Sequence, residues 1–201
     1  MYTQYLDTQR PVMCIDKHVG FDATDGVGIM GDQFQRELLF LDSLGKDSIE
    51  VRITSPGGVI LDGMMMYDSI IKTKTQVNTY CGGVAASIAA ITFCAGNRRR
   101  MRPYAKLMFH NPSGGSGGKE LGVLKDALVK MIAARCRMTE EQVSKMLDRT
   151  TWIGAEEALT LGICTEIDYS EDSVYNFSDD VQLAWREARN IENDLLKKKA
   201  Q

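Results

Sequence analysis

One serine and one histidine of this chain could together perform nucleophilic chemistry. Ser87 follows a Gly-Gly pair and opens an alanine-rich apolar run, and His110, one of only two histidines, ends an apolar strand-like segment. A serine hydroxyl is a weak nucleophile unless a nearby base takes its proton, and histidine is the usual base near neutral pH. The pair therefore suggests a nucleophilic site with Ser87 as the attacking group.

Such a site also needs N–H donors for the developing oxyanion, and two backbone positions could supply them. We expect Ser87 at a strand-to-helix transition, where the N–H of Ile88 points forward from the helix start. Gly58 follows a predicted strand and can offer a second N–H with no side chain in the way. By spacing alone two ordinary alternatives stay open, namely that Ser87 is a helix N-cap and that His110 is a core or surface histidine.

The segments that must position these residues alternate between strand and helix patterns, which predicts a single-domain α/β layered fold. Asp32 is expected to be the N-cap of the first helix, and residues 139–142 (TEEQ) are expected to form a capping box. His18 has no motif around it and is interpreted as a surface residue. The spacing predicts strands over 12–15, 27–29, 48–53, 76–81 and 163–167. A further short strand is expected over 101–102, paired with a strand over 106–109. Helices are expected over 32–45, 60–71, 86–95, 119–135, from 139 onward and over 152–162.

Length and composition restrict the protein to an ordinary class. The 201 residues suffice for one well-buried domain, and the net charge of −3 gives no reason to expect nucleic acid as a partner. The basic cluster at 98–102 is interpreted as a solvated turn. The five scattered cysteines show no metal-ligand spacing and fit a reducing compartment. With no signal peptide and no apolar run that could span a bilayer, we expect a cytoplasmic protein without a membrane partner.

The end of the chain differs from the rest. Residues 168–180 are acidic and irregular, and apolar residues then recur at helical spacing up to three lysines at 197–199. We expect one domain over residues 1–169 and, over 170–201, an acidic loop followed by an amphipathic helix that packs on its own domain or on a neighbouring subunit.

Three motifs occur in one order along the chain: residues 55–59 (SPGGV), 83–87 (GVAAS) and 107–112 (LMFHNP). Together they resemble the Clp protease proteolytic subunit (ClpP) family of serine peptidases, over roughly residues 28–167. The short N-terminus and the Thr-Trp pair at 151–152 are most similar to ClpP-like peptidases encoded by phages and prophages, some of which act in capsid maturation.

The resemblance implies a fold, an assembly and a set of roles. The fold would be a ClpP/crotonase-like spiral of β-β-α units, and the subunits would close into rings. Ser87 would be the nucleophile and His110 the general base, and the N–H groups of Gly58 and Ile88 would form the oxyanion hole. No metal and no organic cofactor would be needed.

One position departs from the family pattern. The family has a catalytic aspartate shortly before the closing helix, and this chain has Thr150 there. Asp148 lies on the preceding turn, and we expect it to act as the acid that orients the imidazole of His110. The alternative is that Asp148 is a surface residue at a helix end, which leaves a Ser–His dyad or a silent subunit.

Two functional hypotheses result. The first is a ClpP-like serine endopeptidase that cleaves peptide or protein substrates within a homo-oligomeric ring. Any ATP-driven step would belong to a separate ATPase unfoldase, because the chain has no Gly-x-x-x-x-Gly-Lys loop. The second is a catalytically silent structural subunit of such a ring or of a capsid scaffold. A CoA-ester hydratase or isomerase of the related crotonase fold is a weaker third alternative, since it would not need the Ser87 and His110 pair.

Overall fold

The central strands follow from alternating residue types. In β3 (Ser48–Ile53) the side chains of Ile49, Val51 and Ile53 are fully buried, and the residues between them are half-exposed. The strand β4 (Gln76–Cys81) repeats this pattern beside it. A strand with one apolar face must bury that face against another layer, and here helices supply it.

The computed structural model describes residues 2–24, 26–114 and 118–170. The chain divides into the unit Ser170–Gln201 and the unit Met1–Tyr169, which contains every helix and strand of the described residues. Its remaining strands are β1 (Thr3–Gln4), β2 (Val12–Ile15), β5 (Val84–Ala86), β6 (Arg99–Met101), β7 (Lys106–Phe109), β8 (Thr151–Gly154) and β9 (Glu166–Ile167), and its helices are α1 (Gly31–Ser43), α2 (Ile60–Lys72), α3 (Ile88–Cys94), α4 (Lys119–Ala133), α5 (Glu140–Leu147) and α6 (Ala155–Thr160).

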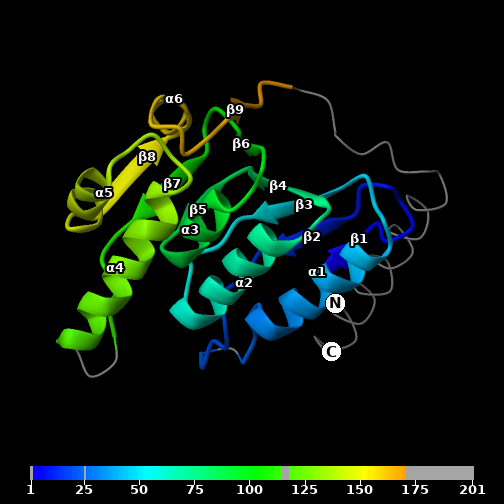
Figure 1. Ribbon diagram of the computed structural model, residues 1–201, viewed down its shortest axis with the longest axis horizontal. Helices are drawn as coiled ribbons and strands as arrows, with labels where there is room; N and C mark the ends of the chain where they lie inside the picture. Colours follow the sequence, from blue (N-terminus) through cyan, green and yellow to red (C-terminus); the bar gives the residue numbers. More distant parts are fainter. Residues whose placement is uncertain (1, 25, 115–117, 171–201) are drawn as a thin grey trace, which may run out of the picture. The chain divides into compact units, whose positions relative to one another are not determined.

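The strands form two sheets. The larger has the order β1-β2-β3-β4-β6-β9 and the smaller the order β5-β7-β8. Pairing is parallel throughout except between β1 and β2 and between β7 and β8. Figure 1 shows α1 and α2 side by side near β2 and β3, while α4, α5, β7 and β8 occupy the other end of this unit.

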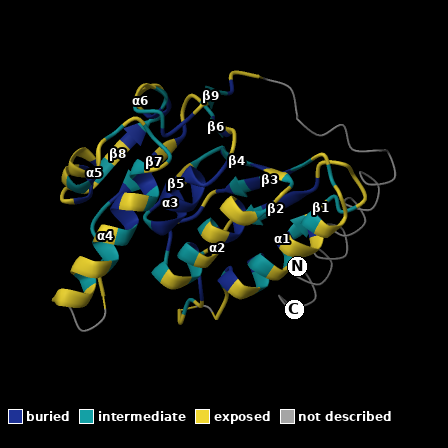
Figure 2. Cartoon of the chain, in the orientation of Figure 1, coloured by how far each residue is buried: buried dark blue, intermediate teal, exposed yellow. Residues whose placement is uncertain are grey.

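The core lies around α3, whose seven residues are all buried. Figure 2 shows this helix in the buried colour and the central strands in a mixture of the buried and intermediate colours, whereas α1, α2 and α4 carry exposed stripes. Small side chains such as Ala89 and Ala90 allow α3 to be packed on every side. None of the helices in the described ranges combines the length and the apolar character that a membrane span requires.

Three strand predictions were wrong. β5 was not expected as a strand, because three residues are too few for a period to be read. The predicted pairing of 101–102 with 106–109 does not occur, since β6 pairs with β4 and β9, and β7 pairs with β5 and β8. Trp152 and Ile153 belong to a strand, β8, and not to the closing helix, which starts at Ala155.

Smaller differences concern the ends of elements. Asp32 is not the N-cap of α1, because the helix starts one residue earlier, with Met30 in the capping position. The capping box of α5 is confirmed, since Thr139 Oγ1 accepts the N–H of Gln142 and Gln142 Oε1 accepts the N–H of Thr139. Over 27–29 only Ile29 forms a bridge, with Val19. The loop and helix predicted over 170–201 lie outside the described residues, apart from Ser170.

The basic cluster is not a solvated turn. Arg99 lies in β6, and its side chain donates to the carbonyl oxygens of Ile163 at 2.8 Å, Gly96 at 2.9 Å and Gly162 at 3.0 Å. Burial lowers the pKa of this guanidinium. Arg98, by contrast, is exposed and pairs with Glu166. Arg99 therefore holds the end of α3 and the segment before β9 to the sheet.

We predict that Arg99→Leu lowers the free energy of unfolding by about 3 kcal/mol, because buried carbonyl oxygens lose a charged donor. The control is Arg98→Leu, which removes an exposed ion pair and should cost less than about 1 kcal/mol. Denaturant unfolding of both variants measures the difference, and equal stabilities would contradict a structural role for Arg99.

Candidate active site

Ser87 lies at the junction of β5 and α3 in a strained conformation. Its backbone has φ +56° and ψ −130°, a region that residues other than glycine rarely adopt. It is the N-cap residue of α3, yet its side chain makes no capping hydrogen bond. Strained residues persist where the surrounding structure fixes them, and they cluster at active sites. Ser87 therefore occupies the N-cap position that one ordinary alternative expected, but its side chain does not cap the helix.

The side chain of Ser87 meets His110 instead. Ser87 Oγ and His110 Nε2 are 2.8 Å apart, and both residues are half-buried. The neutral imidazole with its proton on Nδ1 accepts the serine proton in this geometry. The backbone N–H of Ser87 also donates to the carbonyl oxygen of Met108 at 2.8 Å, two residues before the histidine. Pairing of β5 with β7 thus brings the hydroxyl and the imidazole together.

The loop after β3 approaches this pair closely. Ser55 exchanges backbone hydrogen bonds of 2.9 Å with Val84 and Ala86 on either side of its bridge to Ala85. Gly57, at φ +91°, comes so near that a Cβ atom on it would lie 2.7 Å from Cβ of Ser87. A side chain at this position would push the serine out of place, so the loop can reach the site only with glycine there.

Two N–H groups are available beside the serine. The residues on either side of Gly58 bond to Val19, and Gly58 itself does not. The carbonyl oxygen of Gly57 accepts from the N–H of Val19, and the N–H of Val59 donates to the carbonyl oxygen of Val19. Ile88 opens α3, where a helix leaves its first N–H groups without intrahelical partners. Within the described part of the chain, neither the Gly58 nor the Ile88 N–H has a hydrogen-bond partner.

A pocket beside Ser87 is lined by both of these residues. The residues that line it include three buried apolar side chains from three elements, Ile91 of α3, Phe109 of β7 and Leu128 of α4. Such a lining favours an apolar side chain over a charged one, because a charge there would lose its hydration without a partner. The full lining is Gly58, Ile60, Ser87, Ile88, Ile91, Phe109, His110, Pro112, Ser113 and Leu128.

Asp148 is exposed at the C-terminal end of α5, and the hydrogen bonds of its side chain go to Lys125 and Asn111 and not to His110. Its Oδ1 accepts from Lys125 Nζ at 2.7 Å and from Asn111 Nδ2 at 3.0 Å. These two donors, Lys125 first, lower the pKa of the Asp148 carboxyl. No hydrogen bond between Asp148 and His110 exists among the described residues, so the role expected for this acid stays a prediction.

Thr150 directly precedes β8, and His110 directly follows β7. The two strands are antiparallel, and their last pair at this end is Phe109 and Thr151. If this register continued by one residue, position 150 would lie opposite His110, and an aspartate there would be placed on the strand beside the histidine. Threonine has no carboxylate with which to stabilise a charged histidine.

The sequence interpretation missed three residues around the site. His18 is half-buried against Gly58, not on the surface. Asn111 joins Asp148 to the end of β7, and Lys125 joins Asp148 to α4. Only the adjacency of Asn111 to His110 could have been noticed in the sequence. Over the described ranges, no group of three or more His, Cys, Asp and Glu side chains is arranged to hold a metal ion.

We predict that the free energy of unfolding of Ser87→Gly exceeds that of Ser87→Ala by about 1 kcal/mol, because glycine adopts φ +56° without strain. The glycine variant should therefore unfold at the higher temperature. Thermal unfolding of the two variants gives the comparison. An alanine variant as stable as the glycine variant would show that the conformation of Ser87 costs little.

Comparisons with known proteins agree with this geometry. The family model described as Clp protease matches residues 28–171. An ATP-dependent Clp protease proteolytic subunit of Bacteroides thetaiotaomicron is 36% identical over 146 residues, which span 66% of this chain and 66% of that protein. The structure of a mutant of ClpP1 from Listeria monocytogenes superposes with a TM-score of 0.72 at 27% identity, over 83% of this chain and 95% of that one. The predicted fold class is thus confirmed, and the chain belongs to the Clp protease family.

Proposed function

We propose that this chain is a serine endopeptidase that works within an oligomeric ring, as expected from the family. The observation that carries the proposal is the 2.8 Å contact between Ser87 Oγ and His110 Nε2. The strained backbone of Ser87 and the two available N–H groups beside it support the same conclusion.

In the proposed reaction Ser87 Oγ attacks the peptide carbonyl carbon while His110 Nε2 takes the serine proton. The carbonyl oxygen becomes an oxyanion, which accepts hydrogen bonds from the N–H groups of Gly58 and Ile88. His110 then gives the proton to the departing amine, and the C–N bond breaks to leave an acyl-enzyme. Water, deprotonated by His110, hydrolyses the ester and restores Ser87.

In this proposal Asp148 affects His110 indirectly, through the residue that follows it. Its bond to Asn111, together with the ion pair to Lys125, ties the residue after His110 to α4 and α5. It would thus position the end of β7 and not touch the imidazole. Ser87 and His110 then work as a dyad, unless another group takes the place that Thr150 occupies.

A ring would explain the exposed apolar side chains of α1 and α2, among them Phe40, Leu61 and Met65. The relative from Bacteroides thetaiotaomicron is described as an ATP-dependent subunit. We extend this to the present chain only as a proposal that a separate ATPase unfolds protein substrates and delivers them to the ring. Mass photometry of the purified full chain tests the ring.

A silent structural subunit is the second candidate, and Thr150 is the observation in its favour. Such a chain would form rings and cleave nothing. A phage capsid scaffold belongs to the same class of function. The activity measurements below separate this candidate from the peptidase.

We predict that the wild-type chain cleaves a fluorogenic peptide with leucine or methionine before the scissile bond in preference to one with lysine or aspartate, because Ile91, Phe109 and Leu128 line the pocket and the described residues of the lining include no Asp, Glu, Lys or Arg side chain to pair with a charge. Ser87→Ala should lower kcat by about a thousandfold or more. Unchanged cleavage by Ser87→Ala would end the proposal, and an inert, ring-forming wild type would favour the silent subunit.

We further predict opposite effects at two neighbouring positions. Thr150→Asp should raise kcat/KM by about tenfold or more, because a carboxylate opposite His110 stabilises the imidazolium. Asp148→Asn should lower kcat/KM by less than about tenfold, whereas direct loss of a catalytic acid costs about ten-thousandfold. A loss of that larger size in Asp148→Asn would show that Asp148 is the acid after all.

A further inference from the structure

The second histidine of the chain lies against the proposed oxyanion-hole glycine. A Cβ atom built on Gly58 would lie 2.5 Å from Cε1 and 2.7 Å from Nε2 of His18. The carbonyl oxygen of Val19 would lie nearer still, so the imidazole and this carbonyl together occupy the space that a side chain at position 58 would need. His18 comes from the loop after β2, far from Gly58 in the sequence, and the reaction proposed above gives it no role.

The backbone of this loop is fixed from two sides. On one side the N–H of Val19 donates to the carbonyl of Gly57 and its carbonyl accepts from the N–H of Val59, each at 2.8 Å. On the other side the carbonyl of His18 accepts from Ile29 at 2.8 Å. Val19 itself is fully buried. The ring of His18 is thus carried on a segment that cannot move independently of Gly58.

The ring lies behind the glycine with respect to the substrate. At φ +148° a Cβ atom on Gly58 would point away from the N–H of the same residue. A group packed in that direction therefore contacts the Gly58 backbone on the side opposite to the N–H. In agreement, the described residues that line the pocket include Gly58 but not His18. Nδ1 of the ring lies 3.4 Å from the carbonyl oxygen of Gly20, a long distance for a hydrogen bond, so packing defines the contact of the ring with Gly58.

We infer that His18 is a positioning residue, whose imidazole packs behind Gly58 and holds the Gly58 N–H toward the carbonyl oxygen of a peptide bound at Ser87. The inference rests on the proposed peptidase function. A donor displaced by even a fraction of its bond length stabilises the oxyanion less, while binding of the ground-state peptide changes little.

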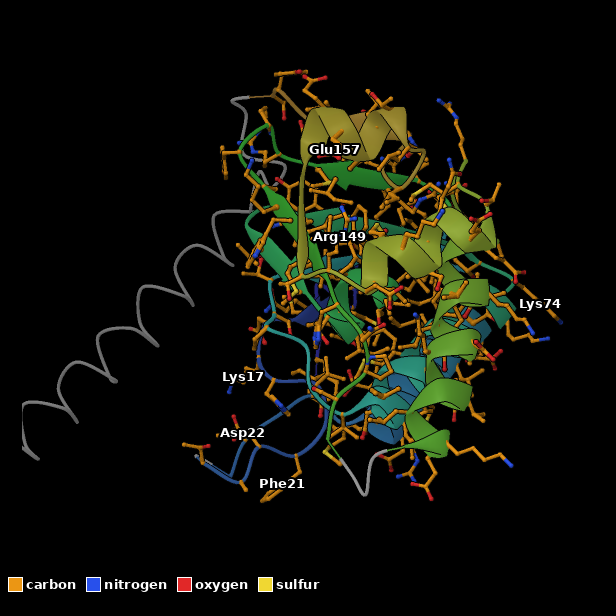
Figure 3. The ribbon with its side chains drawn as sticks, turned by 90° about the vertical axis from the view of Figure 1, so that its left-hand side faces the viewer. Lys17, Phe21, Asp22, Lys74, Arg149 and Glu157 are labelled. Carbon is orange, nitrogen blue, oxygen red and sulfur yellow. The ribbon has the colours of Figure 1, made fainter. Side chains whose placement is uncertain are left out.

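Three variants of the full-length chain test this role. His18→Ala removes the ring, His18→Phe keeps a planar ring without ring nitrogens, and Lys17→Ala is the control on the same loop, where Lys17 is exposed (Figure 3). Each is assayed for kcat and KM with the fluorogenic peptide and for inhibition by the matching peptide aldehyde, whose adduct with serine carries an oxygen in the oxyanion position. Active sites are titrated so that rates refer to folded enzyme.

We expect His18→Ala to lower kcat by about 10- to 100-fold with KM within about threefold, and to weaken the aldehyde in parallel. His18→Phe should recover most of both losses, and Lys17→Ala should match the wild type. If His18→Ala does not fold, His18→Asn, which is shorter than histidine, takes its place with the same expectation. Partial unfolding alone would lower the titrated fraction of active sites and leave aldehyde affinity unchanged.

A folded His18→Ala enzyme with wild-type kcat and aldehyde affinity would overturn the inference, and so would a His18→Phe variant as impaired as His18→Ala. These results leave the peptidase function intact. An inert wild type that does not bind the aldehyde would instead reject the peptidase function, and the role of His18 with it.

Discussion

The geometry of the site depends on the pairing of two short strands, β5 and β7. Their parallel register places Ala86 beside Met108, and the N–H of Ser87 extends the ladder by donating to the carbonyl of Met108. Because Ser87 and His110 each follow directly from these strands, the distance between hydroxyl and imidazole is set by backbone hydrogen bonds. A site held in this way needs no flexible side chain to search for its partner.

The same arrangement stores strain and requires tight packing. Ser87 is held at φ +56°, and the loop through Gly57 comes within contact distance of its Cβ. The helix α3, which begins directly after the serine, has all seven of its residues buried. Several features that cost stability are therefore concentrated within one turn of the nucleophile, as is usual where function needs a fixed geometry.

The sequence predicted the longer elements well, because β3, β4, α1, α2 and α4 each contain enough residues for a period to appear. It could not predict β5, which is three residues long, or the true partners of β6 and β7, since pairing is set by tertiary contacts. Arg99 was predicted to be solvated, because nothing local reveals that the carbonyl groups of Gly162 and Ile163, distant in the sequence, accept from its side chain. At the site, motifs indicated Ser87, His110 and the glycine loop. The contact of His18 with Gly58 and the link from Asn111 to Asp148 join residues that no local pattern connects.

The most direct measurement of the central claim is intact-mass analysis after reaction with a fluorophosphonate, a probe that labels only activated serines. The proposed mechanism predicts a single adduct on the wild-type chain and none on Ser87→Ala, since an activated serine requires the base and donors arranged around it. A folded wild-type chain that takes up no probe, or an adduct that persists in Ser87→Ala, would contradict the assignment of Ser87 as the nucleophile.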